Sequence, residues 1–173
     1  MAEAPEIPEA TNPFEERVAL TIALLAVVLA LVENLGDNAK TSAILKTNEA
    51  ANQWAYYQSK SIKQNLYETE SRLVGFLSTA DAASQAKTRE QIASEVARYQ
   101  AEKGEIKQSA ERLVAEAQAN SRVNDRCDLA SLLLQVAVVV CSVSILSTWK
   151  PLWLGGIGLG VAGAFVGVTA FLM

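Results

Sequence analysis

The sequence predicts an all-α membrane protein with three transmembrane helices and a long antiparallel coiled-coil hairpin between the first and the second. Half of the 173 residues are hydrophobic, and they concentrate in runs near the two ends of the chain. No proline stands between Phe14 and Lys150, so very long helices are permitted there. Apolar residues in the middle recur with helical periods and not with the alternation of a strand.

Residues 1–16 are expected to form a disordered acidic tail. They hold five Glu, three prolines and no Lys or Arg. Such a composition buries too little apolar surface to fold alone. The lack of positive charge ahead of Arg17 argues against a secretory signal.

Residues 17–35 are expected to form the first transmembrane helix. Val18 to Val32 is a run of fifteen residues in which only Thr21 is polar. A span needs about 20 residues, so a buried helix of a soluble protein is the alternative. We favour a span, because the chain offers no soluble core large enough to bury this run.

Residues 128–149 and 152–173 are expected to form the second and third transmembrane helices. Lys150 and Pro151 between them predict a very tight turn. Trp149 and Trp153 flank that turn, as expected where aromatic rings lie at a membrane interface.

A stripe of small residues runs along each span at steps of three, four or seven. Small residues let helix backbones approach closely in lipid, so these stripes predict a tightly packed bundle, within or between subunits. The stripes are Ala19, Ala23, Ala26 and Ala30 in the first span, Ala130, Ala137, Cys141 and Ser144 in the second, and Gly156, Gly160, Gly163, Gly167 and Ala170 in the third.

Residues 36–127 are expected to form the hairpin, with its tip at about residues 78–88, where Thr88 can cap the second helix. In the first half apolar residues recur every eleven, which favours a straight or slightly right-handed seam. In the second half they step by four and three, which is a heptad pattern with one polar intruder, Lys103.

The predicted seam serves either the hairpin or a contact between subunits. The two periods imply opposite supercoil senses, so an isolated pair of helices could not match along its full length. We therefore expect a homo-oligomer with cyclic symmetry; the simpler alternative is that the stripes are only the mutual core of one hairpin. The seam residues are Ile44, Ala51, Trp54, Ala55, Tyr57, Ile62, Leu66, Leu73, Phe76, Leu77, Ile92, Val96, Tyr99, Ile106 and Leu113.

Three polar residues near the spans form a candidate polar site. Glu33 and Asp37 lie just past the first apolar run, and Gln135 lies inside the second span. Intramembrane carboxylates usually function as cation or proton sites. The alternative, which we favour, is that the two carboxylates mark the end of the span and that Gln135 is an interhelical hydrogen-bond partner.

Composition argues against several classes of function. The chain has no histidine, and Cys127 and Cys141 are not at metal-ligand spacing, so we expect no metal, no cofactor and no enzymatic activity. Residues 33–128 interleave 14 acids with 13 bases, which is typical of a solvated helical face and not of a nucleic-acid-binding surface.

The segment Asn48 to Glu68 carries a recognisable motif, Gln53-Trp54-Ala55-Tyr56-Tyr57-Gln58 followed by Lys60-Ser61-Ile62-Lys63. It resembles domain-of-unknown-function family 4337 of bacterial membrane proteins. The resemblance extends over nearly the whole chain. It implies a bacterial inner-membrane protein and carries no activity with it.

Three functions are consistent with this architecture. The first is a homo-oligomeric, membrane-anchored coiled-coil scaffold. The second is a pore formed by the small-residue spans, and the third is an accessory subunit of a larger membrane complex. Basic residues near the membrane are more numerous on the hairpin side, so the positive-inside rule favours a cytoplasmic hairpin; they are Lys40, Lys46, Arg112, Arg122 and Arg126, against Arg17 and Lys150 on the other side.

Overall fold

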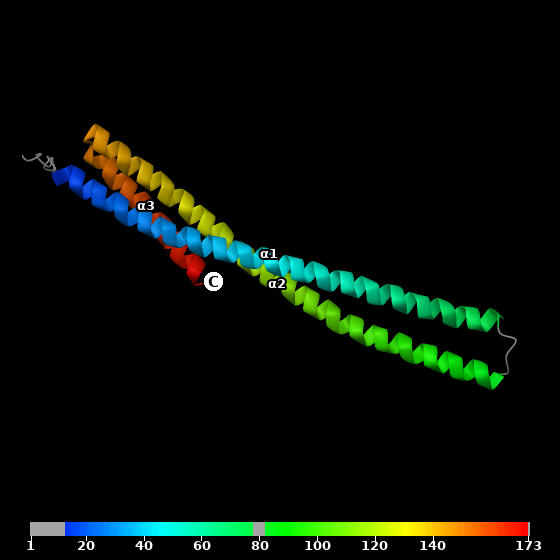
Figure 1. The fold of residues 1–173 in the computed structure, drawn as a ribbon. Coiled ribbons are helices and arrows are strands. Elements are labelled where there is room, and N and C mark those ends of the chain that lie inside the picture. The colour runs from blue at the N-terminus through cyan, green and yellow to red at the C-terminus, as the bar shows by residue number, and fades with distance from the viewer. Residues whose placement is uncertain (1–12, 78–81, 173) are drawn as a thin grey trace, which may run out of the picture. The chain divides into compact units, whose positions relative to one another are not determined.

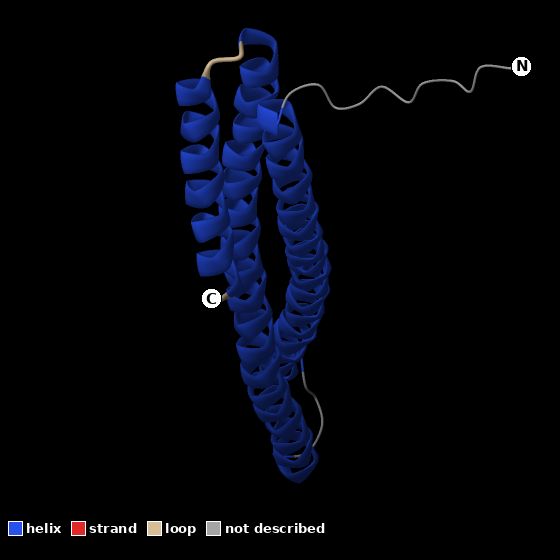
Figure 2. Cartoon of the chain, turned by 90° about the vertical axis from the view of Figure 1, so that its left-hand side faces the viewer, coloured by secondary structure: helices blue, strands red, loops and turns tan. Residues whose placement is uncertain are grey.

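A computed structural model of the chain describes residues 13–77 and 82–172, and within this part every regular element is an α-helix (Figures 1 and 2). Helix α1 is Pro13–Leu77 (65 residues), α2 is Ala82–Ser147 (66 residues) and α3 is Lys150–Phe171 (22 residues). The side chains of residues 75–77 and 171 are also outside the description.

Helix α1 begins earlier than the sequence predicted and does not break. It starts at Pro13, inside the segment expected to be a disordered tail, and residues 1–12 of that tail lie outside the described residues. Proline is well suited to a first helical position, and Glu15 and Glu16 in the first turn favour the helix dipole. The helix then continues through Gly36 without interruption.

Helix α2 also begins earlier than expected. It starts at Ala82, so the predicted tip at residues 78–88 is too long. Thr88 is not a cap, because it lies inside the helix and its Oγ1 donates a hydrogen bond to the Ser84 carbonyl at 3.1 Å. Residues 82–87 are rich in Ala, Gln and Lys, which are good helix formers.

The turn between α2 and α3 lies two residues before its predicted place. Thr148 has a positive φ of 54° and Trp149 is extended, whereas Lys150 and Pro151 already belong to α3. Pro151 occupies the first turn, where a helix loses no hydrogen bond by lacking an N–H. The turn is closed by Leu152 N–H, which donates to the Trp149 carbonyl at 3.1 Å.

All three helices are long and apolar enough to cross a membrane. Their most apolar stretches have mean hydropathies of 2.4, 2.5 and 1.7 for α1, α2 and α3. Only 11% of that stretch in α1 is buried inside the chain, against 33% in α2. Most of the apolar surface of α1 therefore faces outward.

The chain divides into two compact units. Unit 1 comprises residues 1–41 and 120–173, and unit 2 comprises residues 42–119.

In unit 1, α1, α2 and α3 pack against one another, and α2 provides three of the five buried residues of the core cluster (Figure 1). The small-residue stripe of α2 is buried, as are the four glycines and Ala170 of the α3 stripe. The core cluster consists of Val32, Cys127, Ala130, Leu134 and Ala170.

The alanine stripe of the first span is not part of this packing. Ala19, Ala23, Ala26 and Ala30 are all exposed within the chain. Helix α1 instead turns larger residues inward, among them Val18 and Val32. Val32 lies opposite Gly167 and Leu25 lies opposite Gly160, so side chains larger than alanine fill the space beside these glycines of α3.

In unit 2, the α1 and α2 segments run antiparallel. Ion pairs link Lys46 with Glu116 and Lys60 with Glu102. As the residue number increases along α1, that of its partner on α2 decreases, which is the pattern of antiparallel helices. On α2 the buried residues are Ile92, Tyr99, Ile106, Ala110, Leu113 and Ala117, with Val96 half-buried. These are the positions of the heptad pattern.

Only part of the predicted α1 seam lies toward α2 in unit 2: Trp54 and Tyr57 are half-buried, whereas the other described members are exposed, namely Ile44, Ala51, Ala55, Ile62, Leu66 and Leu73. The buried residues are Ala50 and Gln64, and the half-buried ones between and beyond them follow steps of three and four, including Gln53, Tyr57 and Lys60. Both helices therefore contact each other with a heptad spacing. The predicted mismatch of supercoil sense is wrong, because the eleven-residue stripe is not the contacting face.

Candidate functional site

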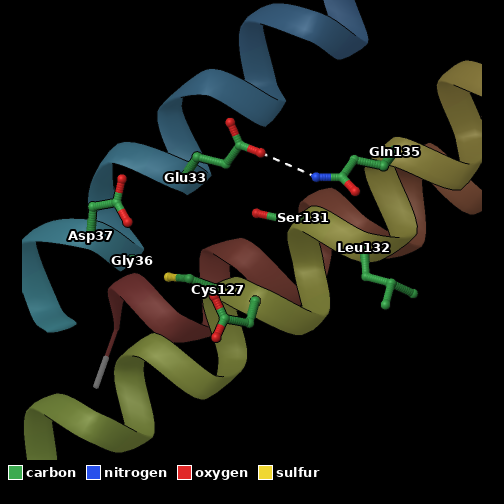
Figure 3. A pocket seen from close by; sticks show the side chains of 8 residues that line it. Glu33, Gly36, Asp37, Cys127, Ser131, Leu132 and Gln135 are labelled. Carbon is green, nitrogen blue, oxygen red and sulfur yellow. Dashed lines mark hydrogen bonds between the residues drawn. The ribbon is translucent and has the colours of Figure 1, made fainter.

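An acidic pocket lies between α1 and α2 in unit 1 (Figure 3). Its volume is about 420 Å³. It contains all three residues of the predicted polar site and five more that the sequence did not single out for it. Its lining is Glu33, Gly36, Asp37, Cys127, Asp128, Ser131, Leu132 and Gln135.

Helix geometry places the polar side chains of the pocket. Glu33 and Asp37 are one turn apart on α1, and Asp128, Ser131 and Gln135 follow one another at helical spacing on α2. Gln135 Nε2 donates to Glu33 Oε1 at 3.2 Å, which makes it an interhelical hydrogen bond (Figure 3).

A close approach of the two helices forms the closed end of the pocket. A Cβ atom at Gly36 would lie 2.9 Å from Cys127 Cβ, which is too short for two carbons in contact. Gly36 is therefore required for packing and does not act as a hinge. Cys127 is buried at 1% exposure beside it.

Apart from Gln135, the α2 residues of the pocket were missed, because their partners on α1 are about a hundred positions away in the chain. A signal was nevertheless present, since Asp128, Ser131 and Gln135 step by three and four on one helix face. Ser131 is buried at 8% exposure, and its side chain is drawn between Glu33 and Cys127 in Figure 3.

The pocket has the charge of a cation site but not the arrangement of a metal site. Its charged lining residues are three carboxylates, one of which, Asp128, accepts a hydrogen bond from Asn124 Nδ2 at 3.0 Å. Within the described residues no group of three or more His, Cys, Asp or Glu side chains could hold a metal ion.

The glycines of α3 determine how closely the helices of unit 1 approach. A Cβ at Gly163 would lie 3.1 Å from the Ala130 carbonyl oxygen and 3.0 Å from Leu134 Cγ. One at Gly156 would lie 3.3 Å from the Ala137 carbonyl oxygen and 2.5 Å from Cys141 Sγ. These contacts involve backbone atoms, so the helices would have to separate to admit a side chain.

The other two glycines of the stripe face α1. A Cβ at Gly160 would lie 2.5 Å from Leu25 Cδ2, and one at Gly167 would lie 2.9 Å from Val32 Cγ2. Leu25 can rotate away, whereas Val32 is buried and stiff. The α3 stripe therefore contacts both neighbouring helices.

One protein family matches the chain over almost the whole length of the three helices. Residues 14–173 match the model of the family described as "Domain of unknown function (DUF4337)". The chain belongs to this family. No curated protein and no solved structure matches it.

In unit 2 this DUF4337 member has a polar seam. Lys60, whose side chain is 15% exposed, pairs with Glu102, and Lys103 Nζ donates to Gln64 Oε1 at 3.1 Å. Lys60 Nζ also lies 5.1 Å from the centre of the Tyr56 ring and 5.2 Å from that of Tyr99. Polar side chains can face α2 here because each finds a partner.

The ion pair shifts the pKa values of both partners. The hydrogen bond from Lys60 is the main cause that lowers the pKa of Glu102, and the Lys60 and Arg98 charges add to it. The same bond raises the pKa of Lys60, with Tyr56 as a further contributor. Both groups are therefore held in their charged forms.

Aromatic residues complete the seam. Tyr67 stacks on Tyr99 with ring centres 5.7 Å apart, and Trp54 meets Tyr57 edge to face at 5.7 Å. Tyr56 is 49% exposed. Of the predicted seam residues, Phe76 and Leu77 have side chains outside the described part of the chain.

The predicted apolar residues of α1 that do not contact α2 form a second surface, which we call the α1 stripe. The α1 stripe has no partner within the described chain. Its four large members are exposed by 54% (Ile44), 68% (Ile62), 66% (Leu66) and 49% (Leu73). The α1 stripe is Ile44, Ile62, Leu66 and Leu73, together with the exposed Ala51 and Ala55.

Proposed function

We propose that this DUF4337 protein is a membrane-anchored helical scaffold that assembles with copies of itself through the α1 stripe. The observation that carries the proposal is the exposure of that stripe. Apolar side chains recur over about thirty residues of α1, from Ile44 to Leu73, and α1 uses another face to contact α2. A regular stripe of this kind is a helix-packing surface.

A second copy of the same chain is the best-supported partner for the α1 stripe, because of the residues that surround the stripe in unit 2. Lys, Glu and Gln surround the stripe, which is typical of a segment in water and not in lipid. Exposed apolar patches of this extent are a liability on a soluble surface. A symmetric ring of identical chains would cover every copy of the stripe and leave none free.

The membrane spans support the same assembly. The alanine stripe of α1, from Ala19 to Ala30, is exposed in the single chain, and small residues favour close helix contacts in lipid. We propose that this stripe packs between copies, with residues 36–127 forming an extramembrane hairpin.

The proposed location is the bacterial inner membrane, with the hairpin in the cytoplasm. Its basis is the resemblance of the Trp54 motif to bacterial membrane proteins, together with the basic residues near the hairpin side of the spans. The proposal assigns the chain no catalytic activity, no cofactor and no nucleic-acid partner.

Co-purification of two differently tagged copies tests the proposal. Both copies are expressed together, membranes are solubilised in mild detergent, and one tag is captured. The wild-type chain is expected to carry its second-tagged copy along. The Ile62→Gln and Leu66→Gln double variant is expected to reduce that recovery severalfold, because amides on the stripe must be desolvated.

A matched control changes two exposed apolar positions away from the stripe. Val114→Gln with Ala115→Gln on α2 is expected to leave recovery unchanged. Equal recovery in all three proteins would remove the α1 stripe from the assembly. Capture of other polypeptides in fixed ratio, without a second copy, would instead support an accessory subunit.

The acidic pocket favours a second candidate, a pore for cations. Glu33, Asp37 and Asp128 lie where α1 and α2 leave their apolar runs, and acidic residues at such positions select cations. Planar-bilayer recording tests it: cation-selective conductance that Glu33→Gln diminishes supports the pore, and a silent bilayer counts against it.

A further inference from the structure

A second pocket in unit 1 lies where α1 and α3 begin. Its volume is about 400 Å³. The start of α1 and the turn between α2 and α3 lie at the same end of the unit (Figure 2). The lining residues are Pro13, Phe14, Arg17, Thr148, Lys150 and Trp153.

Two cations from different helices line this pocket, and none of its described lining residues is an acid. Arg17 comes from the first turns of α1 and Lys150 from the first residue of α3. Within the described residues neither makes an ion pair. The acids of the first turn of α1, Glu15 and Glu16, are exposed and are not among the lining residues.

Helix ends add to the positive potential. Both α1 and α3 start here, and the aligned peptide dipoles of a helix give its start a partial positive charge. At α3 no side chain caps the helix start, although Leu152 N–H is already bonded to the Trp149 carbonyl. Two side-chain cations and two helix starts therefore converge on one cavity.

The aromatic wall of the pocket is fixed in place. Trp153 meets Phe14 edge to face with ring centres 5.8 Å apart. Its Nε1 donates to Thr21 Oγ1 at 3.2 Å, and Thr21 in turn donates to the Arg17 carbonyl at 2.8 Å. A tryptophan held in this way is typical of the boundary between lipid tails and head groups.

Helix rise places this pocket at a membrane interface. Arg17 and Asp37 are twenty residues apart on one helix, which is about 30 Å at the helical rise and close to the hydrocarbon thickness of a bilayer. The basic pocket and the acidic pocket would then lie near opposite faces of the bilayer. Leu20 and Leu24, exposed by 64% and 61%, follow Arg17 on its own helix face toward the bilayer.

We propose that the basic pocket binds a phosphate group, with Arg17 and Lys150 as its charged ligands and Trp153 as its wall. The chemistry suits the head group of an anionic phospholipid, whose acyl chains would lie along the exposed leucines. Arg presents its donors in a fixed fork that matches phosphate, and Lys adds a point charge. The inference is independent of self-assembly, because every residue it uses lies in one chain.

Native mass spectrometry of the full chain released from detergent micelles tests the proposal. Micelles are doped with phosphatidylglycerol or phosphatidylcholine, and retained lipid is counted per chain. The wild-type chain is expected to retain phosphatidylglycerol in preference. Arg17→Gln with Lys150→Gln is expected to weaken that retention by about tenfold or more, because charged hydrogen bonds to phosphate are strong.

The matched control removes the same charges elsewhere. Lys40→Gln with Arg122→Gln alters one Lys and one Arg that are exposed, make no ion pair among the described residues and line neither pocket. It is expected to retain phosphatidylglycerol as the wild type does. Equal loss in both double variants would overturn the proposal, since net charge alone would then explain retention.

Inorganic phosphate distinguishes the two sources of the ligand. If millimolar phosphate displaces the lipid from the wild type, the pocket binds phosphate in general. If the lipid resists displacement, the ligand is the phospholipid head group together with its acyl chains. Equal retention of phosphatidylglycerol by the wild type and by the Arg17/Lys150 variant would refute the site. Helix content by circular dichroism shows whether each variant is folded; if the double variant is not, the single variants Arg17→Gln and Lys150→Gln carry the same comparison.

Discussion

Gly163 shows how one missing side chain controls helix packing in unit 1. Its neighbours include the Ala130 carbonyl oxygen, which cannot move without α2. Gly158 lies on the same helix with nothing within 4 Å of its would-be Cβ. The two glycines therefore differ in environment while sharing the same helix.

Replacing Gly163 by leucine is expected to destabilise unit 1. Overpacking of a close contact costs about 1–3 kcal/mol, and here the helices must also separate. Gly158→Leu, at an exposed position, is expected to leave the melting temperature unchanged or raise it, since glycine is a poor helix former. Thermal unfolding in detergent, followed by circular dichroism, compares them; equal melting of both variants would show that the α3 stripe does not hold the bundle.

The Lys60–Glu102 pair gives unit 2 a defined pH dependence. The pKa of Glu102 is lowered, so its contribution is complete above its ordinary value of 4.5 and is lost as pH falls through the lowered value. The pKa of Lys60 is raised, so its contribution is complete below 10.5 and is lost as pH rises through the raised value. Stability from this pair is therefore greatest between those two limits.

Replacing Glu102 by glutamine is expected to flatten the acid side of this profile. Melting temperature measured against pH should fall less steeply below 4.5 in Glu102→Gln than in the wild type. Glu111→Gln is the control, because Glu111 pairs with Lys107 at 3.7 Å on an exposed face. An acid limb identical in the wild type and Glu102→Gln would mean that the pair does not stabilise the folded chain.

At the level of single residues, a sequence pattern is most informative where it has one physical meaning. Glycines at steps of four and three in an apolar helix have no use except close approach, and all four lie on buried positions. Alanines at the same steps are less informative, because alanine is also a good helix former on an exposed face. The acidic pocket could be predicted only in part, because Asp128 and Ser131 are far from Glu33 in the sequence. They come together only because α1 packs against α2.

At the scale of the elements, α1 has two faces in unit 2. Hydrophobic periodicity indicates the apolar face, whereas the more polar face contacts α2. The face that contacts α2 includes Gln53, Lys60 and Gln64, whose long stems pack while their polar ends find partners. The apolar face stays exposed. Hydrophobic periodicity predicted the helix correctly but could not predict which face of it contacts α2, because a contact face made partly of polar residues is not visible as a hydrophobic stripe.

Continuity of α1 can be checked by hydrogen exchange. Backbone amides from Val18 to Val74 are expected to exchange as one protected helix with no gap around Gly36, because the close contact at that glycine holds the backbone in helical form. Gly104, which has nothing within 4 Å of a would-be Cβ, is expected to be the weaker point of α2. An unprotected stretch of several residues around Gly36 would contradict a single continuous helix.

At the scale of the whole molecule, the proposed assembly makes each chain one part of a larger complex. The two stripes of α1, alanine in the predicted span and apolar in unit 2, are exposed in the single chain. Both are therefore available for the contacts between copies that the proposed assembly requires.

The most direct test of self-assembly is the mass of the full-length protein in detergent, corrected for bound detergent, by light scattering or analytical ultracentrifugation. The account predicts a single species whose protein mass is an integral multiple of one chain, and a decrease toward one chain in the Ile62→Gln and Leu66→Gln variant. A wild-type protein with the mass of one chain at every concentration, still fully helical, would contradict it.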